Sequence, residues 1–301
     1  MYGTKLTDMD RIITEELTNT FRQALYEGEK RNSTIKKYMR DIEKLKEFLG
    51  GRELSKELLI KYKEELERCG EYKVSSINSF LAAANHFCEV MGWGGLKIKM
   101  IKVQRDTFCP ENKELTQDEY KCLIDTAMDR GDERLALIMQ TLGSTGIRIS
   151  ELRYITVESL KSGMADIYNK GKMRKILYPS DLQKVLKEFA VKMKIKCGPI
   201  FRTGSGRAVD RSNVWKAMKK LCGQAGVDEQ KVYPHNLRHL FAKGFYKIKK
   251  DIAKLADVLG HSSIETTRIY IKTTGKEHKR QLDMMKLVVV KSLRGRKPLL
   301  I

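Results

Sequence analysis

The sequence has little that would take the protein into or across a membrane. Its longest aliphatic run near the carboxyl end, Leu287–Val290, is far shorter than the roughly 20 apolar residues that cross a bilayer. Residues 1–20 alternate charged and apolar side chains and lack the apolar block of a secretory signal. We therefore expect a protein that makes no contact with a membrane.

Cysteine chemistry is equally sparse. The six cysteines include no C-x-x-C pair and form no tight cluster with histidine, which argues against a zinc site or a disulfide framework. Scattered single cysteines fit a reducing cytosol, so the expected location is cytoplasmic.

Acidic residues are few. The chain has 38 Asp and Glu against 59 Lys and Arg, a net charge of +21. Because 41% of its residues are hydrophobic, it is not a disordered polycation, and 301 residues suffice for about two domains of ~150 residues. The surplus indicates a polyanionic partner, most simply nucleic acid. Anionic lipid, or a basic surface with no special partner, is the alternative.

The charge is unevenly distributed along the chain. Residues 1–107 carry 20 basic and 17 acidic residues (+3), whereas residues 108–301 carry 39 and 21 (+18). The main phosphate-facing surface is therefore predicted in the second part. Residues 93–114 contain Gly94, Gly95 and Pro110 without a helical stripe of apolar residues, and are predicted to be the interdomain linker.

Both parts are predicted to be mainly helical. Apolar residues at helical spacing predict four helices before the linker, and the spacing of Thr116 and Glu119 predicts a capping box after it. Short alternating segments predict a three-stranded antiparallel sheet, with strands at Arg153–Val157, Met164–Tyr168 and Lys175–Tyr178. Further helices are predicted at about 181–194, 211–222, 235–248, 251–259 and 263–272. The expected fold class is mainly α, with a four-helix domain and a mixed α/β domain.

Two segments place a guanidinium where it can bind an anion. Arg148 follows a helix broken at Gly146, where free helix N-terminal amides lie nearby, although an ion pair with Glu151 explains it better on local evidence. His235 and Arg238 lie three residues apart on a helix that begins near Pro234, so they share one face. A solvated basic helix end is the ordinary explanation for this second pair.

Two more segments carry other reactive side chains. His261 falls in a turn after Gly260, and Tyr270 lies in the following helix between two isoleucines, a setting that by itself indicates core packing. Residues 169–175 form a cationic hairpin tip with Lys170 and Lys172, which on its own is an ordinary solvated turn.

Taken together and in this order, these residues resemble the tyrosine recombinase (phage integrase) family, which includes the Xer recombinases and transposon integrases. The segments TGIRISEL, HNLRH and LGHSSIETTRIY are similar to that family's signature boxes. The resemblance covers almost the whole chain. It implies that residues 1–107 are a four-helix core-binding (SAM-like) domain and residues 108–301 the catalytic domain.

The resemblance also implies a mechanism. Tyr270 would attack a DNA phosphodiester and form a 3′-phosphotyrosyl enzyme, with help because a phenol of pKa about 10 is a weak nucleophile at neutral pH. Arg148 and Arg238 would bind the non-bridging oxygens, with His235 as acid/base and His261 as a hydrogen-bond donor to the phosphate. Lys170 would protonate the leaving 5′-oxygen, with Lys172 as an alternative, and Glu151 would orient the site. No metal, other cofactor or ATP is required.

Partners follow from the same resemblance. We expect double-stranded DNA, a monomer or weak oligomer when free, and a homo- or heterotetramer on paired DNA sites near the nucleoid. The tail, residues 272–301, would dock on a neighbouring subunit. Two alternatives remain: a type IB topoisomerase that relaxes DNA, and a catalytically silent DNA-binding regulator of the same fold. Residues expected to contact DNA outside the catalytic set are Lys36, Lys37, Arg40, Lys44, Arg174 and Lys175.

Overall fold

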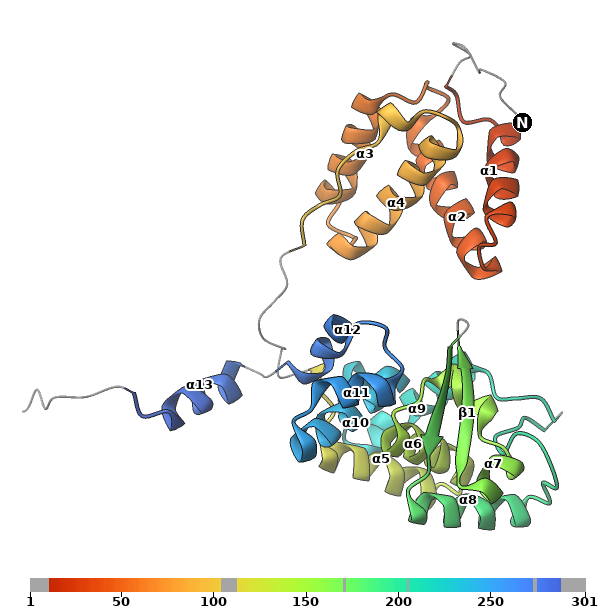
Figure 1. Cartoon of the computed structure of the whole chain (residues 1–301), viewed down its shortest axis with the longest axis vertical. Helices are drawn as coiled ribbons and strands as arrows, with labels where there is room; N and C mark the ends of the chain where they lie inside the picture. Colours follow the sequence, from red (N-terminus) through yellow and green to blue (C-terminus); the bar gives the residue numbers. More distant parts are fainter. Residues whose placement is uncertain (1–10, 104–112, 170–171, 205, 273–274, 288–301) are drawn as a thin grey trace, which may run out of the picture. The chain divides into compact units, whose positions relative to one another are not determined.

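The computed structural model describes residues 11–103, 113–169, 172–204, 206–272 and 275–287. The chain forms two compact units, Met1–Arg105 and Asp106–Ile301 (Figure 1). The described residues are mainly helical, and none of the described helices is long and apolar enough to cross a membrane.

The described residues of the first unit form four packed α helices and one 3-10 turn. Helix α2 packs on α1, α3 and α4, around a core that includes Phe21, Leu45 and Phe87. Asn78 and Asn85 each hold backbone groups that follow α4, at Ile101 and Ile98 respectively, with bonds of 2.8–2.9 Å. The beginning of the predicted linker is therefore tied to this unit. The elements are α1 (Glu15–Glu27), α2 (Asn32–Leu49), α3 (Lys56–Arg68), α4 (Val74–Val90) and η1 (Gly94–Leu96).

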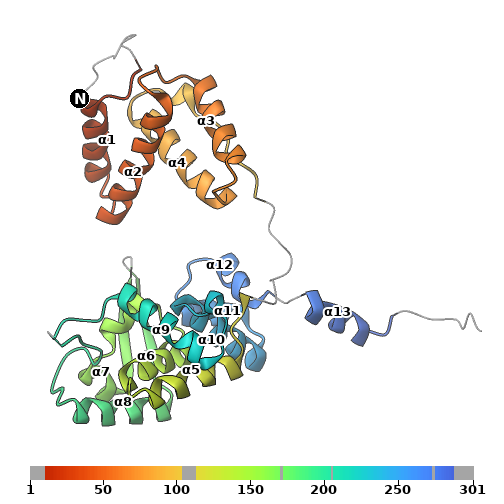
Figure 2. The same cartoon turned by 180° about the vertical axis from the view of Figure 1, so that it is seen from behind.

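The second unit is built around one buried helix, α6. It is apolar on nearly every side and packs against α5, α8, α9 and α10 (Figure 2). The predicted capping box at Thr116 and Glu119 is confirmed at the start of α5. The elements are α5 (Gln117–Asp129), α6 (Glu133–Thr145), η3 (Ile149–Tyr154), α7 (Val157–Ser162), β1 (Met164–Asn169), β2 (Lys172–Leu177), α8 (Ser180–Lys192), α9 (Arg211–Ala225), η4 (Glu229–Lys231), α10 (Pro234–Lys249), α11 (Ile252–Leu259), α12 (Ile264–Arg268), η5 (Ile269–Ile271) and α13 (Gly275–Met284).

The predicted three-stranded sheet is wrong for the described residues, which contain a two-stranded antiparallel sheet, β1 with β2. The segment predicted as the first strand begins inside the 3-10 helix η3. There the Glu151 carboxylate accepts the backbone N–H of Arg148 at 2.7 Å and winds the chain into a tight turn. Only Thr156 keeps strand-like pairing, in an isolated bridge with Pro199.

Gly146 ends α6 in the left-handed conformation, with φ of +65°. A Cβ at this position would lie 2.3 Å from Cδ1 of Phe241 on α10. Glycine therefore serves two purposes here: it permits the backbone turn, and it lets α10 approach the end of α6.

Substitution of Gly146 by Ala should lower the free energy of unfolding by about 2–3 kcal/mol, because backbone strain and a clash with Phe241 add together. Gly131→Ala is the matched control: φ is +71° and no atom lies within 4 Å of the added Cβ. That control should lose only about 1 kcal/mol in urea unfolding. Equal losses in the two variants would contradict the close approach.

Candidate active site

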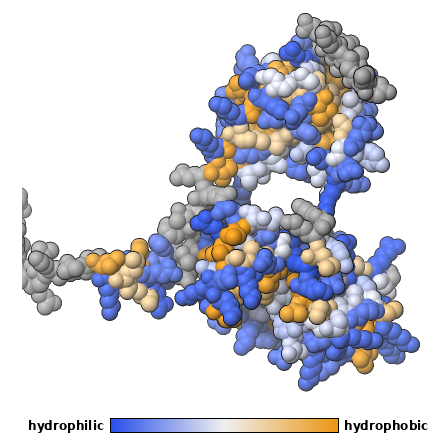
Figure 3. All heavy atoms as spheres, viewed as in Figure 1, coloured by the Kyte–Doolittle hydropathy of each residue, from blue (hydrophilic) through white to orange (hydrophobic). Residues whose placement is uncertain are grey.

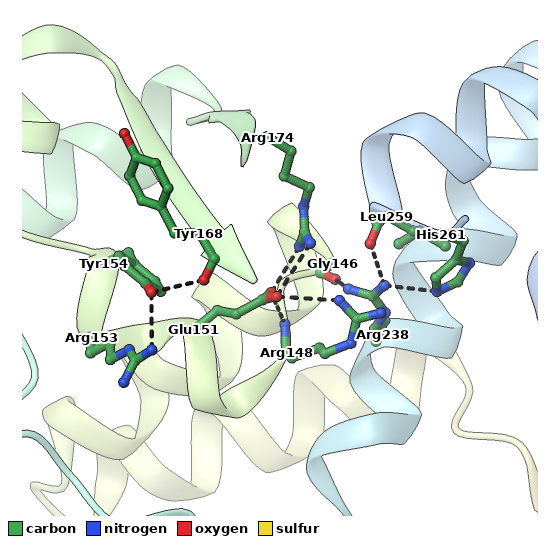
Figure 4. Close-up of polar contacts among 10 residues, drawn as sticks. All are labelled: Gly146, Arg148, Glu151, Arg153, Tyr154, Tyr168, Arg174, Arg238, Leu259 and His261. Atoms are coloured by element: carbon green, nitrogen blue, oxygen red, sulfur yellow. Dashed lines mark hydrogen bonds and ion pairs between the residues drawn. The ribbon is translucent and has the colours of Figure 1, made fainter. Parts of the chain in front are cut away.

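Arg238, on α10, is fully buried and is bound by backbone oxygens rather than by a carboxylate (Figure 4). It donates from Nη1 to the Gly146 carbonyl, and from Nη2 to the Leu259 carbonyl at 2.6 Å. Both carbonyls lie at helix C-termini, of α6 and α11, where the helix dipole is negative. Dipoles stabilise this cation without cancelling its charge.

The remaining surroundings of Arg238 keep it cationic and leave its Nε without a hydrogen-bond partner among the described residues. Burial, and the nearby positive charge of Arg148, lower the pKa of Arg238 to about 10, so it stays protonated at neutral pH. Among the described residues no carboxylate lies within ion-pair distance of it, and its buried Nε has no hydrogen-bond partner. A buried donor without a partner is costly, and Nε of Arg174 is in the same state.

Glu151 joins two further arginines beside Arg238. Its buried carboxylate accepts Nη1 of Arg174 at 3.2 Å and Nη2 of Arg174 at 2.8 Å, a bidentate pair, and Nη1 of Arg148 at 3.2 Å. Burial raises the pKa of Glu151, but the Arg148 backbone N–H and the Arg174 guanidinium outweigh burial and hold that pKa below its usual value. The carboxylate is therefore ionised at neutral pH.

We call Arg148, Arg174 and Arg238 the arginine cluster. Three guanidinium charges against the single carboxylate of Glu151 leave a net charge of +2 on these four residues. Arg148 is the most accessible of the cluster, with 32% of its side chain exposed. The arrangement is suited to an anion that carries two negative charges, such as the transition state of phosphoryl transfer.

Tyr270 lies next to this cluster and is nearly buried, 5% exposed, in the 3-10 turn η5 that follows α12. Its hydroxyl lies 3.0 Å from Nε2 of His235, at the start of α10. Burial, followed by the charges of Arg238 and Arg148, lowers the pKa of His235, so its imidazole is neutral at pH 7. A neutral Nε2 can accept the phenolic proton.

Both ring nitrogens of His261 have hydrogen-bond partners within the protein, Arg238 and Thr267. Its Nε2 lies 2.9 Å from Nη2 of Arg238, and its Nδ1 lies 2.9 Å from the buried hydroxyl of Thr267. A guanidinium can only donate, so Nε2 must accept, and Nδ1 carries the proton. Burial and the nearby arginines lower the pKa of His261 to about 4, which is consistent with this neutral tautomer.

His239 belongs to the same group of rings, although it was not among the predicted site residues. Its ring centroid lies 4.3 Å from that of Tyr270, closer than those of His235 and His261. The available signal was its position one helical turn after His235, which places both rings on one face of α10. Burial, with His235 and Lys243 nearby, lowers the pKa of His239 to about 4.

The structure therefore brings together most of the predicted catalytic residues. Lys170 lies outside the described residues, and of Lys172 only the backbone is described, opposite Asn169 in the β1–β2 register. The residues that meet at this site are Arg148, Glu151, Arg174, His235, Arg238, His261 and Tyr270.

The residues predicted to contact DNA differ in how exposed they are and in whether they are paired with other side chains. The guanidinium of Arg174 is bound to Glu151, and only 12% of its side chain is exposed. Its contact with DNA stays a prediction. Lys175 is exposed and pairs with Asp166 at 3.0 Å. The other four lie on α2 of the first unit: Lys36 and Arg40 are exposed, Lys37 contacts Asp41, and Lys44 contacts Tyr72.

A search for metal sites among the described residues finds no group of three or more His, Cys, Asp or Glu that could hold an ion. The expectation that no metal or cofactor is needed remains a prediction.

The low pKa of His239 predicts how stability depends on pH. The unfolded chain binds a proton at this residue as pH falls through about 6.5, whereas the folded chain does not until about pH 4. Stability is therefore complete above pH 6.5 and falls toward pH 4. His239→Gln should remove about 1–2 kcal/mol of the loss between pH 7 and pH 5, measured by urea unfolding. Ile248→Gln, at an exposed position of α10, should keep the full loss. An unchanged loss in His239→Gln would refute a buried neutral imidazole.

Both a family model and individual relatives match this chain, and both are of the phage integrase and tyrosine recombinase type. Residues 113–277, more than half of the chain, match the model of the phage integrase family. The tyrosine recombinase XerA of Pyrococcus furiosus is 28% identical over 228 residues, which cover 73% of this chain and 78% of that protein. XerA of Pyrococcus horikoshii is 25% identical over 290 residues, which cover 94% and 98%.

A solved structure extends the likeness to the fold. A lambda integrase tetramer bound to a Holliday junction superposes with a TM-score of 0.70 at 16% identity, covering 88% of this chain and 78% of that one. From the family match, we conclude that this chain belongs to the phage integrase family, among relatives that are tyrosine recombinases.

Proposed function

We propose that the protein is a site-specific recombinase that cuts and rejoins DNA strands through a 3′-phosphotyrosyl intermediate. One observation carries the proposal: the Tyr270 hydroxyl is hydrogen-bonded to a neutral imidazole, and its ring lies beside Arg238, whose Cζ is 6.0 Å from the ring centroid. A nucleophile, a base and a cationic phosphate site thus lie within one chain. Membership of the phage integrase family supports the same reaction class.

The proposed step is an in-line displacement at phosphorus. The Tyr270 oxygen forms a bond to phosphorus as its proton passes to Nε2 of His235, and the bond from phosphorus to the 5′-oxygen breaks. Lys170, with Lys172 as the alternative, would give its proton to that leaving oxygen. Attack by another 5′-hydroxyl reverses these bonds and rejoins the strand, so no ATP is consumed.

The arginine cluster would supply the electrostatic stabilisation. Arg148 is partly exposed and can bind a non-bridging oxygen, and Nε of Arg238 is a donor that has no partner among the described residues. For His261 we propose a different role from the phosphate contact expected at first. Because both its ring nitrogens are engaged, it would orient the guanidinium of Arg238.

The same proposal assigns the DNA contacts of the first unit to α2. Lys36 and Arg40 are exposed there, and Lys44 lies 4.3 Å from the centre of the Tyr72 ring. The core-binding role and the assembly into a homo- or heterotetramer on paired sites are part of this proposal. The lambda integrase tetramer on a Holliday junction supports such an assembly for a protein of this fold. The reaction would take place on DNA in the cytoplasm.

We further propose that the tail docks on a neighbouring subunit. Helix α13 and the turn after it carry an exposed apolar face (Figure 3). This face includes Leu282 on the helix and Met285 in the turn. Leu282 is 53% exposed and Met285 is 56% exposed, so this face is available to a partner. The strand-like segment predicted at residues 287–290 lies almost entirely outside the described residues.

The proposal is tested by trapping the protein on a nicked suicide DNA that carries its recombination site. The wild type should form a covalent adduct, and Tyr270→Phe should form none while it binds the same DNA with nearly unchanged affinity. Tyr246→Phe, a change elsewhere in the second unit, is the matched control and should form the adduct.

An adduct that survives in Tyr270→Phe would refute the assignment of the nucleophile. Efficient relaxation of any supercoiled plasmid, without a recombination site, would point to a topoisomerase instead. Failure of the wild type to form an adduct would point to a DNA-binding regulator.

A further inference from the structure

Arg174 reaches Glu151 from a different part of the fold than Arg148 does. Arg174 lies on β2, whereas Glu151 and Arg148 belong to the turn that forms η3 (Figure 4). The Arg174 pair is bidentate, with the shorter bond at 2.8 Å, and Arg148 makes one side-chain bond of 3.2 Å. Arg174 therefore holds most of the carboxylate, and Arg148 is held more loosely.

The path of the Arg174 side chain is fixed by a glycine. A Cβ at Gly260 would lie 2.6 Å from Nη1 and 2.7 Å from Cδ of Arg174. Gly260 caps α11 with φ of +65°, directly before His261. Because residue 260 has no side chain, there is room beside it for the Arg174 side chain that pairs with Glu151.

Without Arg174, the Glu151 carboxylate would compete with the phosphate for the guanidinium of Arg148. It is a buried carboxylate whose pKa is lowered by the Arg148 backbone N–H and then by Arg174, so it needs cationic partners to remain ionised. Arg148 is also paired with Glu151, so it is positioned to take the place of Arg174 if Arg174 were removed. Arg148 would then be drawn into a bidentate pair with Glu151, away from the phosphate.

From this geometry we infer that Arg174 is a positioning residue, which saturates the Glu151 carboxylate and so leaves the guanidinium of Arg148 free to bind the scissile phosphate. This inference rests on the proposed function. Arg174 itself does not touch the substrate: both its Nη atoms are bound to Glu151, and only 12% of its side chain is exposed.

The experiment measures the rate of covalent adduct formation on the nicked suicide DNA. Arg174→Met keeps aliphatic bulk beside Gly260 but removes the charge, and its rate should fall about 100-fold with DNA affinity unchanged. Adding Glu151→Gln removes the carboxylate that captures Arg148. The double variant should therefore recover at least about tenfold relative to Arg174→Met alone.

Arg174→Lys is a second, milder variant. It keeps a positive charge that can make only one contact with the carboxylate, and it should lose about tenfold. Leu177→Thr, an exposed change on the same strand, is the matched control and should react at the wild-type rate. Thermal unfolding of each variant shows whether it is folded.

The outcomes separate the inference from the proposed function. No adduct with the wild-type protein would refute the proposed function itself. With an active wild type, a double variant as slow as Arg174→Met or slower would overturn the inference, because a merely structural strut or a direct phosphate contact is not restored by Glu151→Gln. A wild-type rate in Arg174→Met would overturn it as well.

Discussion

The buried guanidinium of Arg238 is the interaction on which the rest of the site depends. A charge removed from water is costly unless polar groups surround it, and here two helix C-termini supply carbonyl oxygens, at Gly146 and Leu259. A carboxylate in their place would have neutralised the cation and closed the site to a phosphate. Because dipoles stabilise the charge without cancelling it, the fold retains an uncompensated cation where α6, α10 and α11 meet.

This uncompensated charge also sets the protonation of the histidines. Positive charge from Arg238 contributes to the lowered pKa of His235, His239 and His261, after burial. Neutral imidazoles can accept hydrogen bonds, and two of these histidines are placed to do so for different purposes. His235 faces the hydroxyl of Tyr270, whereas His261 accepts a hydrogen bond from Arg238. The arginines thus prepare the base as well as the phosphate site.

Much of the site was predictable from the sequence, although two of the segments have an ordinary structural explanation that is also true. Tyr270 is indeed buried, in a cluster with Leu255 and Leu259, and Arg148 does pair with Glu151. Only the joint order of the residues indicated a site. What could not be predicted depends on long-range contacts: the partner of Arg174 lies 23 residues away in η3, and nothing local distinguishes Arg174 from other cations of the hairpin. The strand predicted at Arg153–Val157 is wrong for a similar reason. The hydrogen bond between the Glu151 carboxylate and the Arg148 backbone N–H winds the chain into a 3-10 turn, despite the alternating pattern of apolar residues.

The central claim is that one chain holds both the nucleophile and the phosphate site, since Tyr270 and His235 are hydrogen-bonded within it. The most direct test mixes two inactive variants, Tyr270→Phe and Arg148→Ala, on nicked suicide DNA. A site complete within each chain predicts no covalent adduct at any mixing ratio, because neither variant has both parts. An adduct that appears only in the mixture would contradict the account, because it would mean that Tyr270 of one subunit attacks the phosphate bound by another.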